Sequence, residues 1–258
     1  MYLQFAQLMR QAGTMLLDRS SFTVFEKEGH ANYVTERDKE VQSFLMEGLA
    51  KILPEATFFA EEKENAALGS EPTFLIDPID GTLNFMHGRE ASAISVALLE
   101  NSQPIWGGIY QPYTGRLFHA RRGDGAFCND TPIHTANNPF HKGVTAFGTA
   151  PYNTELHPTT LRAAGLFLAE TADLRRTGSA ALDLCDVACG RSDVYWELML
   201  SPWDYGAGAL ILTESGGMVS RADGSPLSFE CPGTVLAASP ACYEKALSLL
   251  RKSFALPQ

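Results

Sequence analysis

The spacing of apolar and polar positions predicts that the chain opens with two helices. Apolar residues recur three and four positions apart from Phe5 to Leu16, which is typical of a helix with one buried face. A second helix is predicted to begin after Thr35, with Asp38 at its third position, and to end before Pro54. Its predicted buried face consists of Val41, Phe44, Leu45 and Leu49.

The segment after these helices is predicted to form a sheet. The runs Thr57–Ala60 and Thr73–Ile76 are short, apolar and rich in aromatic and branched residues, as in strands buried on both faces. Further strands are predicted at 94–98, 105–110, 116–120 and 126–128, with glycine-containing turns between several of them. Because short turns join antiparallel neighbours, we expect this sheet to be antiparallel.

The pattern changes after about residue 140 and alternates between helix and strand. Helices are predicted at 161–169, 180–188, 206–214 and 243–250, and strands at 144–147, 194–196 and 235–238. No linker rich in proline or serine marks the change. We therefore expect two subdomains, 1–140 and 141–258, that pack as one body.

Composition and charge narrow the classes of function. The chain has 258 residues, of which 45% are hydrophobic and 19% charged, as in ordinary globular proteins. Twenty basic against thirty acidic residues give a net charge of −10, which argues against nucleic acids and anionic membranes as partners. The five cysteines form no C-x-x-C pair, and no apolar run is long enough to cross a bilayer. We expect a soluble, cytoplasmic protein with reduced thiols, and an anionic substrate would need positive charge supplied locally.

The first candidate for chemistry is the string Asp77-Pro78-Ile79-Asp80-Gly81-Thr82-Leu83-Asn84, directly after the predicted strand 73–76. Pro78 stiffens the bend between two carboxylates, and Gly81 lets the backbone approach a ligand closely. The amides of Gly81 and Thr82 are expected to open a helix, where free N–H groups favour a phosphate. The alternative is an ordinary turn in which Asp77 or Asp80 caps a helix.

A second acidic position follows the neighbouring predicted strand. Glu61 and Glu62 come after 57–60, so the ends of two core strands would place Glu61, Asp77 and Asp80 in one cleft. Like charges ~4 Å apart repel by ~4 kcal/mol at an effective dielectric constant of ~20. Such a cluster takes up protons or binds divalent cations, and its oxygen ligands suit Mg²⁺ or Mn²⁺ rather than zinc. A solvated charge cluster at Glu61-Glu62 is the alternative.

The third candidate is the string Ser201-Pro202-Trp203-Asp204-Tyr205-Gly206-Ala207-Gly208, which leads into a predicted helix. Asp204 would lie in the first helical turn, where a carboxylate stabilises the helix dipole. The small residues at 206–208 would let the start of this helix pack closely against another element. If this helix meets the cleft, Asp204 becomes a further metal ligand.

Together these strings resemble the inositol monophosphatase family of magnesium-dependent, lithium-sensitive sugar and polyol phosphatases. The resemblance extends from the first helix to Val235–Ser239, and only small residues differ from the common pattern, at Ala60 and Gly206. It implies a layered α/β/α/β/α fold with an antiparallel N-terminal sheet, a mixed C-terminal sheet and the active site between the two halves. It also implies a homodimer.

The resemblance implies roles for individual residues. Glu61, Asp77 and the carbonyl of Ile79 match the ligands of a first metal ion, and Asp77, Asp80 and Asp204 those of a second. Glu61 would reach a weaker third ion through water. Thr82 matches the hydroxyl that orients the attacking water, supported by Asp38, although Thr35 and Asp38 also fit a helix-capping box. The implied substrate pocket consists of Asp80, Gly81, Thr82, Gly178, Ser179, Ala180, Glu197 and Asp204, with Tyr152, Asn153, Arg175 and Tyr205 at its edge.

The resemblance implies hydrolysis of a small polyol or sugar monophosphate, above all myo-inositol 1-phosphate, by in-line attack of water. Two or three Mg²⁺ ions are expected, with Mn²⁺ as a substitute and Li⁺ as an inhibitor. Leu83-Asn84 matches the inositol phosphate branch, whereas the nucleotide-hydrolysing branch carries Lys-Glu. The alternatives are fructose-1,6-bisphosphatase, histidinol-phosphatase or 3'(2'),5'-bisphosphate nucleotidase activity, and a non-catalytic regulatory binding protein.

Overall fold

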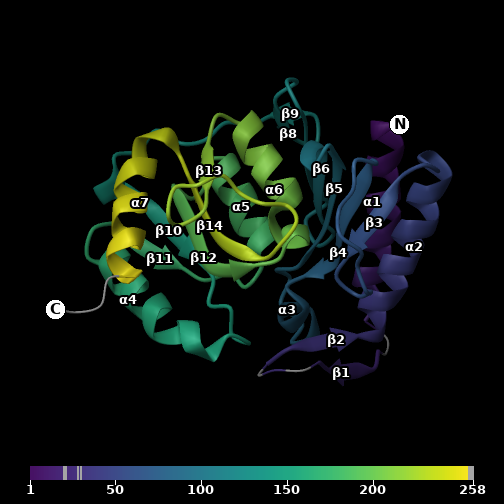
Figure 1. Cartoon of the computed structure of the whole chain (residues 1–258), viewed down its shortest axis with the longest axis horizontal. Coiled ribbons are helices and arrows are strands. Elements are labelled where there is room, and N and C mark those ends of the chain that lie inside the picture. The colour runs from purple at the N-terminus through teal and green to yellow at the C-terminus, as the bar shows by residue number, and fades with distance from the viewer. Residues whose placement is uncertain (20–21, 28, 30, 255–258) are drawn as a thin grey trace.

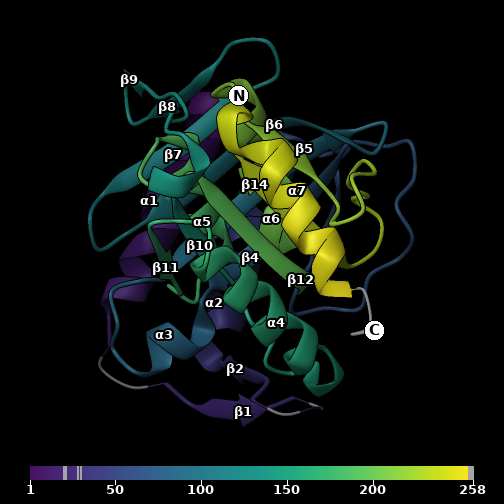
Figure 2. The same cartoon turned by 90° about the vertical axis from the view of Figure 1, so that its left-hand side faces the viewer.

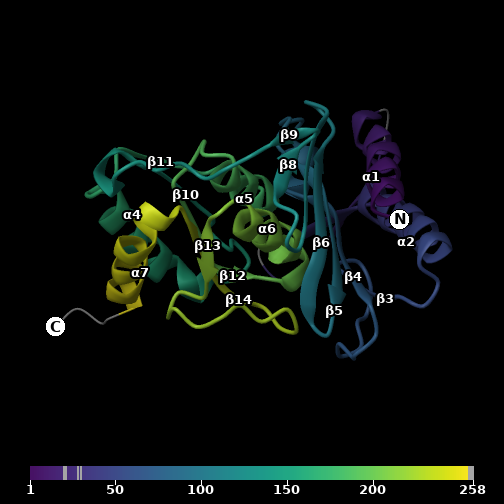
Figure 3. The same ribbon diagram turned by 90° about the horizontal axis from the view of Figure 1, so that it is seen from above.

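The protein is built in five layers, seen from the front and from above in Figures 1 and 3. The computed structural model describes residues 1–19, 22–27, 29 and 31–254. Helices α1 (Tyr2–Leu17) and α2 (Glu36–Ile52) form one outer layer, and α4 (His157–Leu168) and α7 (Pro240–Phe254) form the other. Helices α5 (Ala180–Ala188) and α6 (Pro202–Glu214) lie between two sheets. The expected α/β/α/β/α arrangement is confirmed.

The first sheet has seven strands that neighbour one another in chain order. They are β3 (Thr57–Ala60), β4 (Thr73–Asp80), β5 (Ala93–Glu100), β6 (Gln103–Gln111), β7 (Arg116–Arg121), β8 (Ala126–Cys128) and β9 (Thr131–Pro132). The expected antiparallel pairing holds from β4 to β9. Strand β3, however, is parallel to β4, because residues 61–72 carry the chain back to the end from which β3 began.

The second sheet has five strands in the order β11 (Asp173–Arg175), β10 (Val144–Phe147), β12 (Val194–Leu200), β14 (Gly233–Ala238) and β13 (Met218–Ser220). Strand β10 is parallel to β11 and β12, whereas β14 is antiparallel to β12 and β13, so this sheet is mixed, as expected. A hairpin of β1 (Val24–Glu26) and β2 (Tyr33–Thr35) completes the sheets. The short helices are α3 (Thr82–Met86), η1 (Phe140–Lys142) and η2 (Thr154–Leu156).

Apolar side chains fill the spaces between the layers. The ring of Phe5 from α1 packs edge-on against those of Phe74 and Trp106 in the first sheet. On the far side of the molecule, α4 and α7 cover the second sheet, the face that Figure 2 turns toward the viewer. The predicted face of α2 is wrong at Phe44, which is exposed, because α2 turns Val41, Leu45 and Leu49 inward.

The burial predicted for the first two strands holds only for one of them. Strand β4 is buried at every position, as expected for a central strand. In β3, Thr57 is exposed and Phe58 and Phe59 are half-buried, because β3 lies at the edge of the sheet with β4 on one side only. The prediction of a fully buried strand at 57–60 is therefore wrong.

Helix α6 joins the two halves of the chain. It contacts strands of the first sheet, β13 of the second, and α5. A side chain at Gly107 of β6 would come within 2.9 Å of the Cα of Ala207, so the predicted close packing at residues 206–208 is confirmed. The division into subdomains 1–140 and 141–258 stays a prediction. Within the described ranges, no helix is long and apolar enough to cross a membrane, and all five cysteines are free.

Candidate active site

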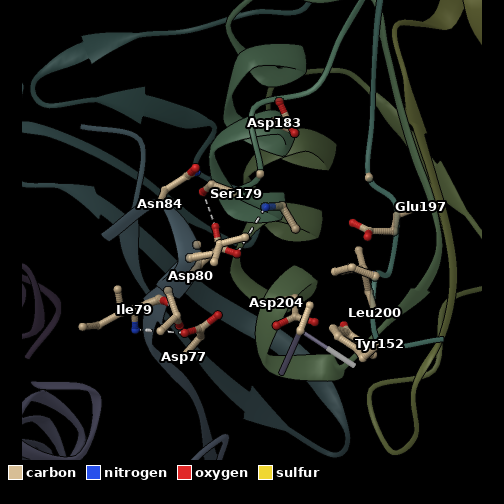
Figure 4. Close-up of a pocket in the computed structure, with 18 of the residues that line it drawn as sticks. Asp77, Ile79, Asp80, Asn84, Tyr152, Ser179, Asp183, Glu197, Leu200 and Asp204 are labelled. Atoms are coloured by element: carbon tan, nitrogen blue, oxygen red, sulfur yellow. Dashed lines mark hydrogen bonds between the residues drawn. The ribbon is translucent and has the colours of Figure 1, made fainter. Parts of the chain in front are cut away.

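A pocket lies between the two sheets, where the end of β4 meets the first turns of α5 and α6 and strand β12 (Figure 4). Its lining includes every one of the predicted metal and substrate residues. Six acidic side chains face it: Glu61, Asp77, Asp80, Asp183, Glu197 and Asp204. The structure therefore brings together carboxylates from widely separated parts of the sequence, as expected.

The end of β4 presents two carboxylates on the same side. Residues three positions apart in a regular strand face opposite sides of the sheet. Here the register with β5 shifts between Asp77 and Asp80, and the strand contains Pro78, a residue found in central strands mainly at bulges. The amide of Ile79 donates to Asp77 Oδ1 at 3.0 Å and stabilises this bend. Gly81 follows with a φ of +87° and begins α3, as the sequence predicts.

The first turn of α5 holds Asp80. The hydroxyl of Ser179 donates to Asp80 Oδ2, and the amides of Ala180 and Ala181 donate to Oδ1 and Oδ2 at 3.1 and 3.0 Å. Burial raises the pKa of Asp80 to about 6, although these hydrogen bonds act in the opposite direction. Residues about 100 positions apart therefore meet at this carboxylate, which ties the two halves of the chain together at the pocket.

Thr82 and Asp38 form the pair that the resemblance implies. The hydroxyl of Thr82 lies 3.1 Å from Asp38 Oδ1 and 3.0 Å from the carbonyl oxygen of Ile79. Asp38 is fully buried, and its second oxygen accepts from the amide and the hydroxyl of Thr35, which forms the predicted capping box. Burial raises the pKa of Asp38. The capping role is confirmed, and the catalytic role stays a prediction.

Asp204 and Glu61 join Asp77 and Asp80 on one side of the pocket, and these four carboxylates form its acidic wall. Asp204 lies in the first turn of α6, where the amide of Ser201 donates to Oδ2 at 2.7 Å. Glu61 follows β3 and pairs with Lys27 Nζ at 3.1 Å. Removal from bulk water raises the pKa of Glu61 to about 7, against the attraction of Lys27. For Asp77, burial first and then the charges of Glu61, Asp80 and Asp204 raise the pKa well above its ordinary range. These carboxylates lie close enough to repel one another.

The donor set of this wall fits divalent cations with hard oxygen ligands. It offers four carboxylates and the carbonyl of Ile79, and its excess negative charge calls for positive charge. No three acidic, histidine or cysteine side chains converge closely enough to hold one ion alone, within the ranges that the structure describes. A cation here would therefore take part of its coordination from water and phosphate oxygens, as Mg²⁺ commonly does.

Glu197 lies at the opposite end of the pocket from the β4 carboxylates (Figure 4). It is buried in β12, where the Ala150 amide donates to Oε1 at 2.8 Å and the Tyr195 hydroxyl donates to Oε2 at 2.7 Å. A side chain at Gly148 would come within 1.8 Å of Oε2, so any larger residue there would displace this carboxylate. Burial raises the pKa of Glu197. Each oxygen retains a lone pair for a ligand hydroxyl.

Three of the four residues expected at the pocket edge lie elsewhere. Tyr152 lines the pocket, but Tyr205 is buried and donates to the carbonyl of Ser228. Arg175 turns away and pairs with Asp173, and Asn153 precedes η2 outside the lining. These three expectations are wrong, because the edge residues depend on how loops from both halves meet.

Four residues in or beside the pocket were not predicted from the sequence. These are Lys27, Arg176, Asp183 and Tyr195. Tyr195 could have been found, because side chains two apart on a strand share a face and Tyr195 is two before Glu197. No sequence signal indicates Lys27, whose contact with Glu61 depends on the place of the β1–β2 hairpin.

A carboxylate-lined pocket between two sheets, with hard oxygen ligands on one wall, fits a metal-dependent hydrolase of phosphate esters. The chain belongs to the inositol monophosphatase family, whose sequence model matches residues 2–254. Enzymes of this family are metal-dependent phosphoric monoester hydrolases. The resemblance inferred from the acidic motifs is confirmed.

Known proteins support this assignment over nearly the whole chain. An inositol-1-monophosphatase of Mesorhizobium japonicum is 36% identical over 228 residues, 87% of this chain and 85% of its own. One of Bacillus subtilis is 32% identical over 240 residues, 92% of this chain and 91% of its own. The crystal structure of the extragenic suppressor protein suhB from Bartonella henselae superposes with a TM-score of 0.90 at 32% identity, covering 97% of this chain and 98% of that one.

Proposed function

We propose that this protein hydrolyses a small polyol monophosphate, above all myo-inositol 1-phosphate, in a reaction that depends on Mg²⁺. The observation that carries the proposal is the convergence of Glu61, Asp77, Asp80 and Asp204 from three separate segments on one pocket wall. Burial first, and then the mutual repulsion of these groups, raise the pKa of Asp77, and this excess of buried negative charge makes the wall a site for cations that also attract a phosphate. Several relatives of the chain are named inositol-1-monophosphatase, which supports the choice of substrate.

We assign two or three Mg²⁺ ions to this wall. Glu61, Asp77 and the Ile79 carbonyl would hold the first, and Asp77, Asp80 and Asp204 the second, with Glu61 reaching a third through water. When bound, these ions supply positive charge to the phosphate oxygens, acidify water and stabilise the departing alkoxide. We expect Mn²⁺ to replace Mg²⁺ and Li⁺ to inhibit.

The side chains of Thr82, at the start of α3, and of Asp38 in α2 would position the attacking water. The Thr82 hydroxyl carries one proton, and when it donates to Asp38 Oδ1 its lone pairs are free to accept from a water molecule. A water held in this way faces the phosphorus for in-line attack, and its proton passes through Thr82 Oγ1 toward the buried Asp38. Asp38, buried and held by Thr35, is fixed in position to receive it.

Phosphate release tests this function directly. The purified protein would be assayed with and without Mg²⁺ on inositol 1-phosphate, glycerol 2-phosphate, fructose 1,6-bisphosphate, phosphoadenosine phosphate and histidinol phosphate. We expect Mg²⁺-dependent release with the highest kcat/KM for inositol 1-phosphate. A higher value for another ester would transfer the assignment to that activity, and no release from any ester would favour the non-catalytic binding protein.

Replacing Glu197 by Gln is expected to raise KM for inositol 1-phosphate about 10-fold and to leave the Mg²⁺ requirement unchanged. The amide group of Gln would face the Ala150 N–H or the Tyr195 hydroxyl, both of which are donors in the native structure. Initial rates over a grid of ester and Mg²⁺ concentrations measure both effects. Glu214→Gln is a matched control, because Glu214 also accepts from two backbone amides but lies outside the pocket lining. A shift in the Mg²⁺ requirement alone would contradict the assignment of Glu197 to the polyol.

We also propose that the protein is a cytoplasmic homodimer. The five free cysteines support a reducing compartment. The resemblance to the family supports the dimer. Light scattering on the eluted protein should give twice the 28.1 kDa of one chain, whereas a mass of one chain would contradict the dimer.

A further inference from the structure

Arg176 is the one positively charged side chain among the described residues that line the pocket. Its Nη2 donates to the hydroxyl of Thr149 at 2.9 Å, and no described residue accepts from its Nε or Nη1. The side chain is exposed to the solvent of the pocket. A guanidinium group carries five N–H donors in a fixed, planar arrangement, so Arg176 offers most of them to a ligand.

The position of Arg176 is defined by its neighbours on both sides. Nη1 comes within 2.4 Å of the place that a Cβ on residue 178 would take, so the guanidinium crosses Gly178 at the first turn of α5. Arg176 is bound to Thr149, and Glu197 is bound by the amide of Ala150, the next residue. One short loop therefore holds both side chains at the same end of the pocket.

We propose that Arg176 determines specificity by donating hydrogen bonds to hydroxyl oxygens of the substrate ring, while Glu197 accepts hydrogen bonds from the ring hydroxyls. This inference rests on the proposed function. Neighbouring hydroxyl groups offer both donors and acceptors, and this pair of side chains supplies the complement. A second phosphate is a poorer occupant, because Asp183 and Glu197 line the same pocket and would repel it. The occupant is therefore a neutral polyhydroxylated ring that carries one phosphate ester.

The test compares two esters that differ in reach. Inositol 1-phosphate carries ring hydroxyls that lie several carbons away from the carbon bearing the ester. In glycerol 2-phosphate, both hydroxyls lie on the carbons next to the one bearing the ester. Arg176→Gln should raise KM for inositol 1-phosphate at least about 10-fold, leave its kcat unchanged, and change KM for glycerol 2-phosphate by less than about two-fold. Arg176→Lys should recover part of the loss. Arg175→Gln is a matched control, because its guanidinium pairs with Asp173 and lies outside the lining, and it should change neither ester.

A binding measurement keeps this test separate from the proposed activity. In a Thr82→Ala background with Mg²⁺, calorimetry would measure the Kd of intact inositol 1-phosphate, and adding Arg176→Gln should raise that Kd at least about 10-fold. Equal losses for both esters, a larger loss for fructose 1,6-bisphosphate, or an unchanged Kd would each overturn the inference. If the native protein released no phosphate but the Kd still rose, the proposed function would fail and the role of Arg176 would stand.

Discussion

The Asp77→Asn variant is expected to lose at least about 1,000-fold in kcat/KM for inositol 1-phosphate and to bind Mg²⁺ more weakly. Asp77 is buried, and its Oδ1 accepts from the amide of Ile79. An asparagine must keep its oxygen on that amide, so its NH₂ group replaces the carboxylate oxygen that faces the pocket. The change removes a negative charge and an acceptor together, and leaves the volume of the side chain unchanged.

The same variant is expected to fold as stably as the native chain, or more stably, when Mg²⁺ is removed. Burial and the charges of Glu61, Asp80 and Asp204 raise the pKa of Asp77, so its ionised form is unfavourable in the folded protein without cations. Removing that charge relieves the repulsion at neutral pH. Thermal unfolding in EDTA measures this effect, and a large fall in Tm would show that lost activity reflects misfolding.

Asp193→Asn is the matched control for these measurements. Asp193 is also a buried aspartate, and it accepts from Asn138 and from the amide of Val144, away from the pocket. We expect this variant to lose stability and to keep its Mg²⁺ dependence. Near-native activity of Asp77→Asn, or an equal change of Mg²⁺ affinity in both variants, would contradict the metal assignment.

The Thr82→Ala variant is expected to lose about 100-fold or more in kcat with little change in KM or in Mg²⁺ affinity. Its hydroxyl donates the hydrogen bond to Asp38, so alanine breaks the path from the pocket to that buried carboxylate. Thr82→Ser keeps the hydroxyl and should retain most of the activity. Steady-state kinetics with a Mg²⁺ titration measure these effects. An unchanged kcat, or a loss confined to Mg²⁺ affinity, would show that Thr82 does not orient the water.

The motifs of the site could be predicted because their chemistry is local. The string from Asp77 to Asn84 encodes a stiff bend and a helix start, and both are found where expected, with Gly81 in the left-handed region between them. The capping boxes at Thr35 and Ser201 are equally local, since each depends on residues three positions apart. A short stretch of sequence is therefore enough to predict how these carboxylates are presented.

Contacts between distant segments could not be predicted from the residues alone. The hydrogen bond from Ser179 to Asp80 joins positions 99 apart and depends on how the two sheets are placed around α5 and α6. The sequence gives no sign that β3 lies at the sheet edge, because an apolar run looks the same in a central strand. Which of two adjacent arginines faces the pocket depends on the end of strand β11, after Arg175. The resemblance placed Arg175 at the pocket edge, but Arg176 lines the pocket.

Crystals grown with Mn²⁺ and phosphate give the most direct test of the acidic wall, because the anomalous scattering of Mn²⁺ identifies it without ambiguity. We expect at least two anomalous peaks in the pocket, with oxygens of Asp77 bound to both ions and oxygens of Asp80 and Asp204 bound to one. Phosphate oxygens should complete the coordination. Crystals of active protein with no Mn²⁺ between Asp77, Asp80 and Asp204, or with Mn²⁺ bound only at the surface, would contradict it.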